Sequence, residues 1–282
     1  MFSLYGIAVV LVVVFFLFLV MGMIYPHMPV TEEYEICSSH LSANRRFVLL
    51  TDLHGCLHGK KNSKLLHMIE KAQPDFICIA GDMTVKNGHH TDEMTELVQQ
   101  LCQTYPVYYS PGNHEKKMPA ADAYKEKLKE AGVHYLENER VFAEGNIVIY
   151  GLDLPEQWYH KFWQRREMKA EHLEQLLGVC RKDCFTLLLA HNPEYAEQYA
   201  AWGADLAVSG HVHGGIMRLP LLGGVIAPSL RLFPEFDAGL YSFREGGAMI
   251  VSRGLGLHHI KLRFFNRPEV SVINLSCQKT GI

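Results

Sequence analysis

The sequence predicts an α/β fold in which strands alternate with helices. Short apolar runs rich in Val, Ile, Leu and Phe recur along the chain, and amphipathic stretches of helical length separate several of them. Several of these runs end directly in Asp, Asn or His beside Gly, where open α/β sheets bind ligands. In a chain of 282 residues this alternation indicates one large α/β domain.

The elements of this domain follow one another from residue 47 onward. Predicted strands cover residues 47–50, 76–80, 107–109, 147–151, 185–190, 204–208, 248–252, 260–264 and 270–275. Predicted helices are a segment whose buried stripe is Leu65, Leu66 and Ile69, and residues 91–103, 119–131 and 167–180.

The N-terminal segment differs from the rest of the chain. Residues 2–25 carry no charged side chain, and at about 1.5 Å per residue they can cross a hydrocarbon layer of roughly 30 Å. We therefore expect residues 1–25 to be a transmembrane helix that anchors a single-pass membrane protein. A cleaved signal peptide is the alternative, but the apolar run exceeds the usual ~7–15 residues, and neither a basic start nor an Ala-x-Ala site accompanies it.

A tether is expected between the anchor and the domain. Pro26 ends the helix, and residues 26–36 contain a further proline and three glutamates, which predicts a short exposed linker. The globular domain is then expected over residues 37–282. Arg45 and Arg46 lie at the edge of the range in which the positive-inside rule applies, so the membrane side stays open, with an extracytoplasmic domain favoured.

Composition excludes several classes of protein. The net charge of −3 and the pI near 6.6 argue against a nucleic-acid binder, which would carry a basic face. The 7 cysteines show no Cys-x-x-Cys spacing, and several lie inside apolar periodic segments, so no disulfide framework is expected.

Five polar motifs each follow a predicted strand. They are Asp52-Leu53-His54, Gly81-Asp82, Gly112-Asn113-His114-Glu115, His191-Asn192-Pro193 and Gly210-His211-Val212-His213. Neutral imidazole is the commonest metal ligand, and two histidines one residue apart between glycines can reach two metals roughly 3.5–4 Å apart. Because the carboxyl ends of the strands meet in one crevice, the sequence predicts a two-metal site there.

These motifs in this order resemble those of the calcineurin-like metallophosphoesterase family. The stretches Ser252-Arg253-Gly254-Leu255-Gly256 and Arg263-Phe264-Phe265-Asn266-Arg267-Pro268-Glu269 resemble its membrane-associated bacterial phosphodiesterase branch. The resemblance implies a two-sheet β-sandwich flanked by helices, with a dinuclear site at one edge.

The resemblance also implies a role for each site residue. The first metal would be held by Asp52, His54 and His213, the second by Asn113, His191 and His211, and Asp82 would bridge them. His114 would be the catalytic histidine. A ligand set without thiolate suits Mn²⁺, Fe²⁺, Zn²⁺ or Ni²⁺.

Charge supports a phosphoester substrate. Two divalent ions outweigh Asp52 and Asp82 by about two charges, which favours a bridging hydroxide and an anionic phosphoryl group. We expect a monomeric, membrane-anchored phosphohydrolase that cleaves a phosphoester or pyrophosphate bond through metal-activated water. A non-catalytic metal-binding interaction module on the same fold is the alternative, although such a module would be expected to have lost one of these residues.

Some of these residues have simpler interpretations. Asp52 and Asp82 could cap helices, and Asn113 could serve the turn that contains it. The loop histidines His58, His89 and His90 are candidate substrate contacts, and Cys56 is expected to pack rather than bind metal.

Two further features bear on the substrate and its surroundings. Glu115 stands where many relatives have Asp, and we expect it to touch no ligand. The segment 219–226 is apolar and has two interpretations. It either packs in the core or contacts an amphiphilic substrate such as UDP-2,3-diacylglucosamine.

Overall fold

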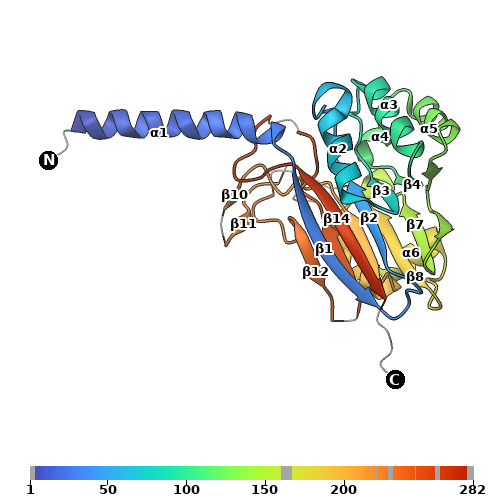
Figure 1. Cartoon of the computed structure of the whole chain (residues 1–282). Coiled ribbons are helices and arrows are strands. Elements are labelled where there is room, and N and C mark those ends of the chain that lie inside the picture. The colour runs from blue at the N-terminus through green and yellow to red at the C-terminus, as the bar shows by residue number, and fades with distance from the viewer. Residues whose placement is uncertain are drawn as a thin grey trace.

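Two β-sheets are stacked face to face, with helices on their outer faces (Figure 1). This computed structural model describes residues 4–159, 167–219, 221–227, 231–244, 246–257 and 261–277. The helix-flanked, two-sheet β-sandwich expected from the sequence is confirmed.

The first sheet contains the N-terminal half of the domain and the last strand. Its order is β1 (Val30–Ser38), β14 (Glu269–Cys277), β2 (Arg45–Leu50), β3 (Phe76–Ala80), β4 (Val107–Ser110) and β5 (His134–Tyr135). All neighbours are parallel except β14 and β2, so the carboxyl ends of β2, β3 and β4 meet at one edge.

The second sheet contains most of the C-terminal half. Its order is β12 (Gly239–Ser242), β13 (Ala248–Val251), β9 (Leu206–Ser209), β8 (Phe185–Ala190), β7 (Ile147–Leu152) and β6 (Glu139–Ala143). The four central strands are parallel to one another. A small hairpin, β10 (Arg218–Leu219) with β11 (Gly223–Gly224), stands apart from both sheets.

Helices cover both outer faces. The first sheet carries α2 (Ser63–Ala72), α3 (Thr91–Cys102), α4 (Asn113–Lys116) and α5 (Ala121–Glu130), and the second carries α6 (Ala170–Leu177) and α7 (Ala196–Trp202). Single 3₁₀ turns lie at Tyr25–His27, Lys60–Asn62, Glu156–Trp158 and Pro193–Tyr195.

The apolar strands contribute side chains to two cores, one between the sheets and one between a sheet and its helices. Successive side chains of a strand point to opposite faces, so Phe47 and Leu49 enter the core between the sheets while Val48 and Leu50 pack under the helices. Burial on both faces explains why these strands are continuously apolar rather than alternating.

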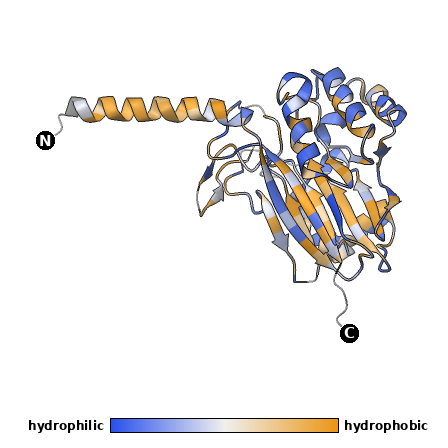
Figure 2. Cartoon of the chain, viewed as in Figure 1, coloured by the Kyte–Doolittle hydropathy of each residue, from blue (hydrophilic) through white to orange (hydrophobic). Residues whose placement is uncertain are grey.

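The N-terminal helix α1 (Leu4–Ile24) projects from the domain (Figure 1). The span Gly6–His27 has a mean hydropathy of 3.3 and is 6% buried, so by length and composition it could cross a membrane. Figure 2 shows hydrophobic residues around nearly the whole of α1. In the part of the chain that the structure describes, α1 meets the domain in its C-terminal third, where Phe18 stacks on Phe264 with ring centroids 4.2 Å apart.

The expected tether over residues 26–36 is shorter in the structure. Residues 30–36 belong to β1, which pairs with β14 along its whole length, so the domain begins at Val30 rather than at residue 37. Glu33 and Glu35 point outward from this edge strand. Charged side chains are common on edge strands because they discourage pairing with further strands. The same charged composition is typical of an exposed linker, which is why the sequence predicts one here.

A second correction concerns the predicted strand over residues 260–264. Ile260 lies outside the described residues, and residues 261–263 form no strand; Phe264 makes one isolated bridge to Met217. The segment is fixed by the Arg263 side chain and by α1 instead of by a sheet. The other predicted strands and helices agree with the structure to within a few residues at each end.

Candidate metal centre

Five loops meet at one end of the sandwich. Those after β2, β3 and β4 come from the first sheet, and those after β8 and β9 come from the second. Backbone hydrogen bonds join the loops, from Asp52 N to Gly81 O (3.0 Å), from His54 N to Asp82 O (3.0 Å) and from Gly210 N to His191 O (3.1 Å). The two sheets therefore build the site together.

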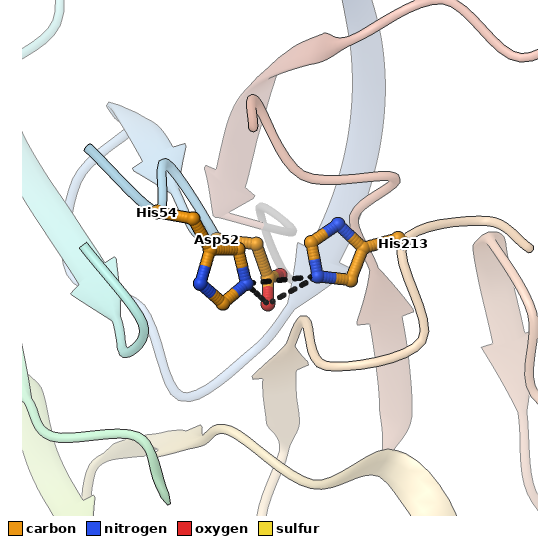
Figure 3. A group of neighbouring side chains, drawn as sticks. All are labelled: Asp52, His54 and His213. Atoms are coloured by element: carbon orange, nitrogen blue, oxygen red, sulfur yellow. Dashed lines mark hydrogen bonds and ion pairs between the residues drawn. The ribbon is translucent and has the colours of Figure 1, made fainter. Parts of the chain in front are cut away.

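One group of side chains consists of Asp52, His54 and His213 (Figure 3). Their imidazoles face each other across the Asp52 carboxylate, with the two Nε2 atoms 3.0 Å apart. Asp52 Oδ1 lies 3.8 Å from His54 Nε2 and 3.4 Å from His213 Nε2. All three residues are buried, so three potential ligand atoms converge in a site largely shielded from water.

A second group consists of Asp82, His191 and His211. His191 Nε2 lies 3.1 Å from Asp82 Oδ2 and 3.9 Å from Asp52 Oδ1, so the two groups adjoin. Asp82 Oδ2 is also 3.9 Å from His54 Nε2. Asp82 therefore lies where the two groups meet, and it also forms a third candidate group with His54 and His114.

The loop after β4 completes the site. His114 Nε2 lies 3.9 Å from Asp82 Oδ2, and its backbone N–H donates to Asp82 Oδ1 (2.8 Å). Asn113 begins α4 beside it. The Oδ1 atom of Asn113 is buried and has no hydrogen-bond partner among the described residues. Because buried oxygens normally have a partner, this atom fits a metal ligand.

Backbone contacts orient the side chains. His191 Nδ1 lies 2.7 Å from Ala80 O and donates its proton there, so Nε2 is the ring nitrogen that faces the centre and is left for a metal. The carboxylate of Asp52 accepts from His211 N at 3.1 and 3.0 Å. These contacts fix the ring tautomer and the carboxylate direction that a metal requires.

The site residues adopt an unusual backbone conformation. Asp52, His54, Asp82, His211 and His213 all have φ between 46° and 70°, in the left-handed region that non-glycine residues seldom occupy. Such strain concentrates at functional sites because the surroundings hold it in place.

Two glycines make room for these residues. A β-carbon on Gly112 would collide with Asp82 Oδ1, and one on Gly210 would collide with Asp52 Oδ2. The close approach of loop and carboxylate depends on their missing side chains.

Electrostatics pair the acids with the histidines. Burial alone would raise the pKa of Asp82, but His191, His54 and His114 outweigh it and hold the pKa well below its usual range. Burial alone would lower the pKa of His191, whereas the Asp82 carboxylate raises it to about 10. Without metal, protons occupy positions that a cation would take, so metal binding would release protons.

Glu115 supports the site from behind, contrary to the expectation that it touches no ligand. Its buried carboxylate accepts from the backbone N–H of the ligand candidate Asp82 (2.9 Å), and also from Met83 (2.7 Å) and Gly112 (3.0 Å). It thereby joins the loops after β3 and β4. The position of Glu115 immediately after His114 was the one sequence feature that pointed to a role at the site. The sequence does not show that its side chain is buried beneath the loops after β3 and β4.

Arg263 is a second supporting residue; it belongs to a stretch that carries the family resemblance, but the sequence alone assigned it no role at the site. Its guanidinium is buried and donates to the carbonyls of Arg253 (2.9 Å) and Gly256 (2.6 Å). Gly256 in turn donates from its N–H to Asp52 O (2.6 Å). Arg263 therefore holds the loop that closes over the backbone of the first motif.

A cavity of about 620 Å³ opens beside the site. His54 and His114 form its inner wall, and Lys86 and Lys261 contribute positive charge. Two of the three candidate contact histidines, His89 and His90, also line it. His58 does not, since it is buried with its Nε2 2.8 Å from Leu255 O. Cys56 lines the cavity and is in none of the candidate metal groups among the described residues.

The donor set suits divalent ions. Two carboxylates, several imidazoles and one carboxamide, without a thiolate, suit Mn²⁺, Fe²⁺, Zn²⁺ or Ni²⁺. The groups around Asp52 and Asp82 each offer three atoms within 4.8 Å of one another. The residues thus fit a dinuclear site for divalent metal ions.

Comparisons with known proteins agree with this chemistry. The chain is 28% identical over 241 residues to a "transmembrane protein with metallophosphoesterase domain" of Danio rerio, across 82% of this chain and 53% of that protein. It is 28% identical over 254 residues to an uncharacterised metallophosphoesterase of Campylobacter jejuni, across 89% of this chain and 64% of that protein. The chain thus spans between half and two thirds of the length of these relatives.

A solved structure and a family model were also matched. The crystal structure of TT1561 of Thermus thermophilus aligns with a TM-score of 0.49 at 14% identity, across 75% of this chain and 90% of that one. The family model for calcineurin-like phosphoesterases matches residues 45–215, which is more than half of the chain and includes all five motifs. The chain therefore belongs to the calcineurin-like phosphoesterase family of metal-dependent hydrolases.

Proposed function

We propose that this protein is a membrane-anchored phosphoesterase that uses two divalent ions to hydrolyse a phosphoester or pyrophosphate bond. The observation that carries the proposal is that the groups Asp52, His54, His213 and Asp82, His191, His211 adjoin, with Asp82 contacting His54 of the first group and His191 of its own. Seven residues would hold the ions: Asp52, His54 and His213 the first, Asn113, His191 and His211 the second, and Asp82 both.

The ions and the protein have separate tasks in this scheme. When bound, the two ions would lower the pKa of a water nucleophile and stabilise charge on the phosphoryl oxygens. The protein keeps the ligands in place through the Glu115 and Arg263 hydrogen bonds. With only two acidic ligands, the loaded site would keep a positive surplus that attracts an anionic phosphoryl group.

His114 is placed to move a proton. The N–H of Lys86 donates to its Nδ1 (3.3 Å), which leaves the ring proton on Nε2. That atom faces Asp82 on one side, and the ring lines the cavity on the other. We propose that His114 Nε2–H donates to the leaving oxygen or to a phosphoryl oxygen of the substrate.

The cavity supports an anionic substrate with an apolar part. Lys86 and Lys261 can pair with phosphate or carboxylate, whereas Leu57 and Leu257 offer apolar contact. Helix α1 could keep the domain at a bilayer, where lipid-linked phosphoesters are found. A lipid-linked substrate such as UDP-2,3-diacylglucosamine is therefore the first one to test.

The test uses the full chain purified in detergent. Turnover of bis-p-nitrophenyl phosphate is measured with Mn²⁺, Fe²⁺, Ni²⁺ and Zn²⁺ in turn, then after chelation and after metal is restored. We expect turnover that chelation abolishes and metal restores. Bound metal without turnover of any phosphoester would favour the non-catalytic module instead.

A further inference from the structure

Exposed apolar side chains surround the base of α1. Leu221 and Leu222, at the tip of the β10–β11 hairpin, are 106% and 63% exposed, and Leu232, Phe233 and Phe265 are about half exposed or more. We call these five residues the apolar rim. In Figure 1 the hairpin lies on the side of the domain from which α1 projects.

We propose that the apolar rim inserts into the interfacial layer of the bilayer that α1 crosses, so that the domain lies partly in the lipid surface. This inference rests on the membrane anchor of the proposed function. It adds a second lipid contact, which fixes how the domain sits on the membrane.

Backbone hydrogen bonds join the rim to α1 as one structure. Arg218 N donates to Phe264 O (3.0 Å), which connects β10 to the segment that packs on α1. Val225 N donates to Met217 O (2.8 Å), and Phe233 N donates to Val225 O (2.9 Å). The hairpin, the segment around Phe233 and the base of α1 therefore form one connected surface.

Contacts with α1 determine how deep the apolar rim lies in the membrane. Phe18 lies 4.2 Å from Phe264 and 6.1 Å from Phe265, measured between ring centroids. Phe18 comes six residues before the end of α1 at Ile24, which is about 9 Å along the helix axis. The 22-residue span is only about as long as the hydrocarbon layer is thick. With this span across the layer, a ring beside Phe18 lies about 9 Å inside the domain-side end of the helix, so Phe265 is placed in the outer part of the lipid layer and not above it.

The chemistry of the hairpin tip also favours lipid. Leu221 has a φ of 69°, in a turn where a water-facing loop would normally have Gly, Asn or Asp. The described residues from Leu219 to Ala227 carry no charge. Tyr25 lies beside Phe265, 6.4 Å between ring centroids, and tyrosine is enriched at membrane interfaces.

This placement also concerns the substrate cavity. Lys261, which lines the cavity, is four residues before Phe265 in the rim. Lys64 Nζ donates to His27 O (3.3 Å), which ties α2 to the base of α1. The cavity wall and the lipid-facing segment are therefore parts of one stretch of chain, which suits a substrate drawn from the bilayer surface.

Tryptophan fluorescence in the full chain tests the proposal. Leu222→Trp is reconstituted in phosphatidylcholine vesicles with or without bromine on the acyl chains, which quenches only tryptophans in contact with them. Leu17→Trp on α1 (60% exposed) reports on the anchor. Val179→Trp (74% exposed) is the matched control, because it follows α6 on the side of the domain away from α1 (Figure 1). The wild-type signal of the 3 native tryptophans is subtracted.

We expect brominated lipid to quench the fluorescence of the tryptophans introduced at residues 222 and 17, and we expect the emission of both to be blue-shifted. The fluorescence of the tryptophan at residue 179 should not change. Quenching at residue 17 with none at 222 would overturn the apolar rim and leave the anchor intact. No quenching at residue 17 would overturn the anchor and the rim together. Leu232→Trp repeats the measurement at a second rim position if the hairpin variant does not fold.

Discussion

Glu115→Gln should weaken both the fold and the metal site. The Glu115 carboxylate accepts five hydrogen bonds, three at Oε1 from Met83 N, Thr84 N and Tyr109 OH, and two at Oε2 from Asp82 N and Gly112 N. Glutamine keeps one acceptor oxygen and turns an NH₂ group toward the remaining donors. In either amide orientation at least two buried donors lose their acceptor.

The size of the effect follows from these contacts. A buried donor without a partner costs about 1–3 kcal/mol, so the substitution should cost about 2–6 kcal/mol of a domain stability that is typically about 5–15 kcal/mol. For a protein of this size that corresponds to roughly 5–20 °C in the unfolding temperature. Because Asp82 loses a support behind its backbone, metal affinity should fall by about 10- to 100-fold.

Thermal unfolding of the full chain in detergent and a metal titration of the metal-free protein measure the two effects. Glu126→Gln, at an exposed position on α5, is the matched control and should change neither. If Glu115→Gln unfolds at the same temperature as this control and binds metal with wild-type affinity, the positioning role of Glu115 is wrong.

Three further predictions concern other parts of the site. His114→Ala should keep the bound metal and lower kcat by about 10²- to 10⁴-fold. The control His67→Ala, at an exposed histidine on α2, should leave kcat unchanged. If His114→Ala loses bound metal together with activity, the proton-transfer role is contradicted. Arg263→Met removes the donor to several buried carbonyls and should cost about 2–4 kcal/mol in a denaturant titration, and an unchanged midpoint would refute the account of its loop. Gly210→Ala should lower metal content measured by mass spectrometry, because the added carbon collides with Asp52, and a variant with full metal content would refute that clash.

Strand ends were the most predictable part of this protein. Strands buried on both faces are continuously apolar, and each ligand candidate follows one of them directly, so the sequence alone predicts that these residues converge. The structure brings Asp52, His54 and His213 together, and likewise Asp82, His191 and His211. Asn113 and His114 lie beside the second group through the contact of His114 N with Asp82.

The supporting residues were harder to predict because their partners are backbone atoms. Glu115 binds the N–H of Asp82, 33 residues earlier in the chain, and Arg263 binds carbonyl groups of the loop that precedes it. Such contacts with backbone atoms leave no pattern of side chains in the sequence. Strand β1 was missed for a different reason. Its acidic residues lie on an exposed edge, where a strand and a linker have similar compositions.

The two-metal mechanism is the central claim, and a metal titration tests it most directly. Metal-free full chain is titrated with Mn²⁺ while bound metal and turnover of bis-p-nitrophenyl phosphate are measured on the same samples, with Asp82→Asn in parallel. The account predicts that turnover rises until two ions are bound per chain, and that Asp82→Asn binds fewer ions and stays inactive. Full turnover without metal, or an active Asp82→Asn variant that holds two ions, would contradict it.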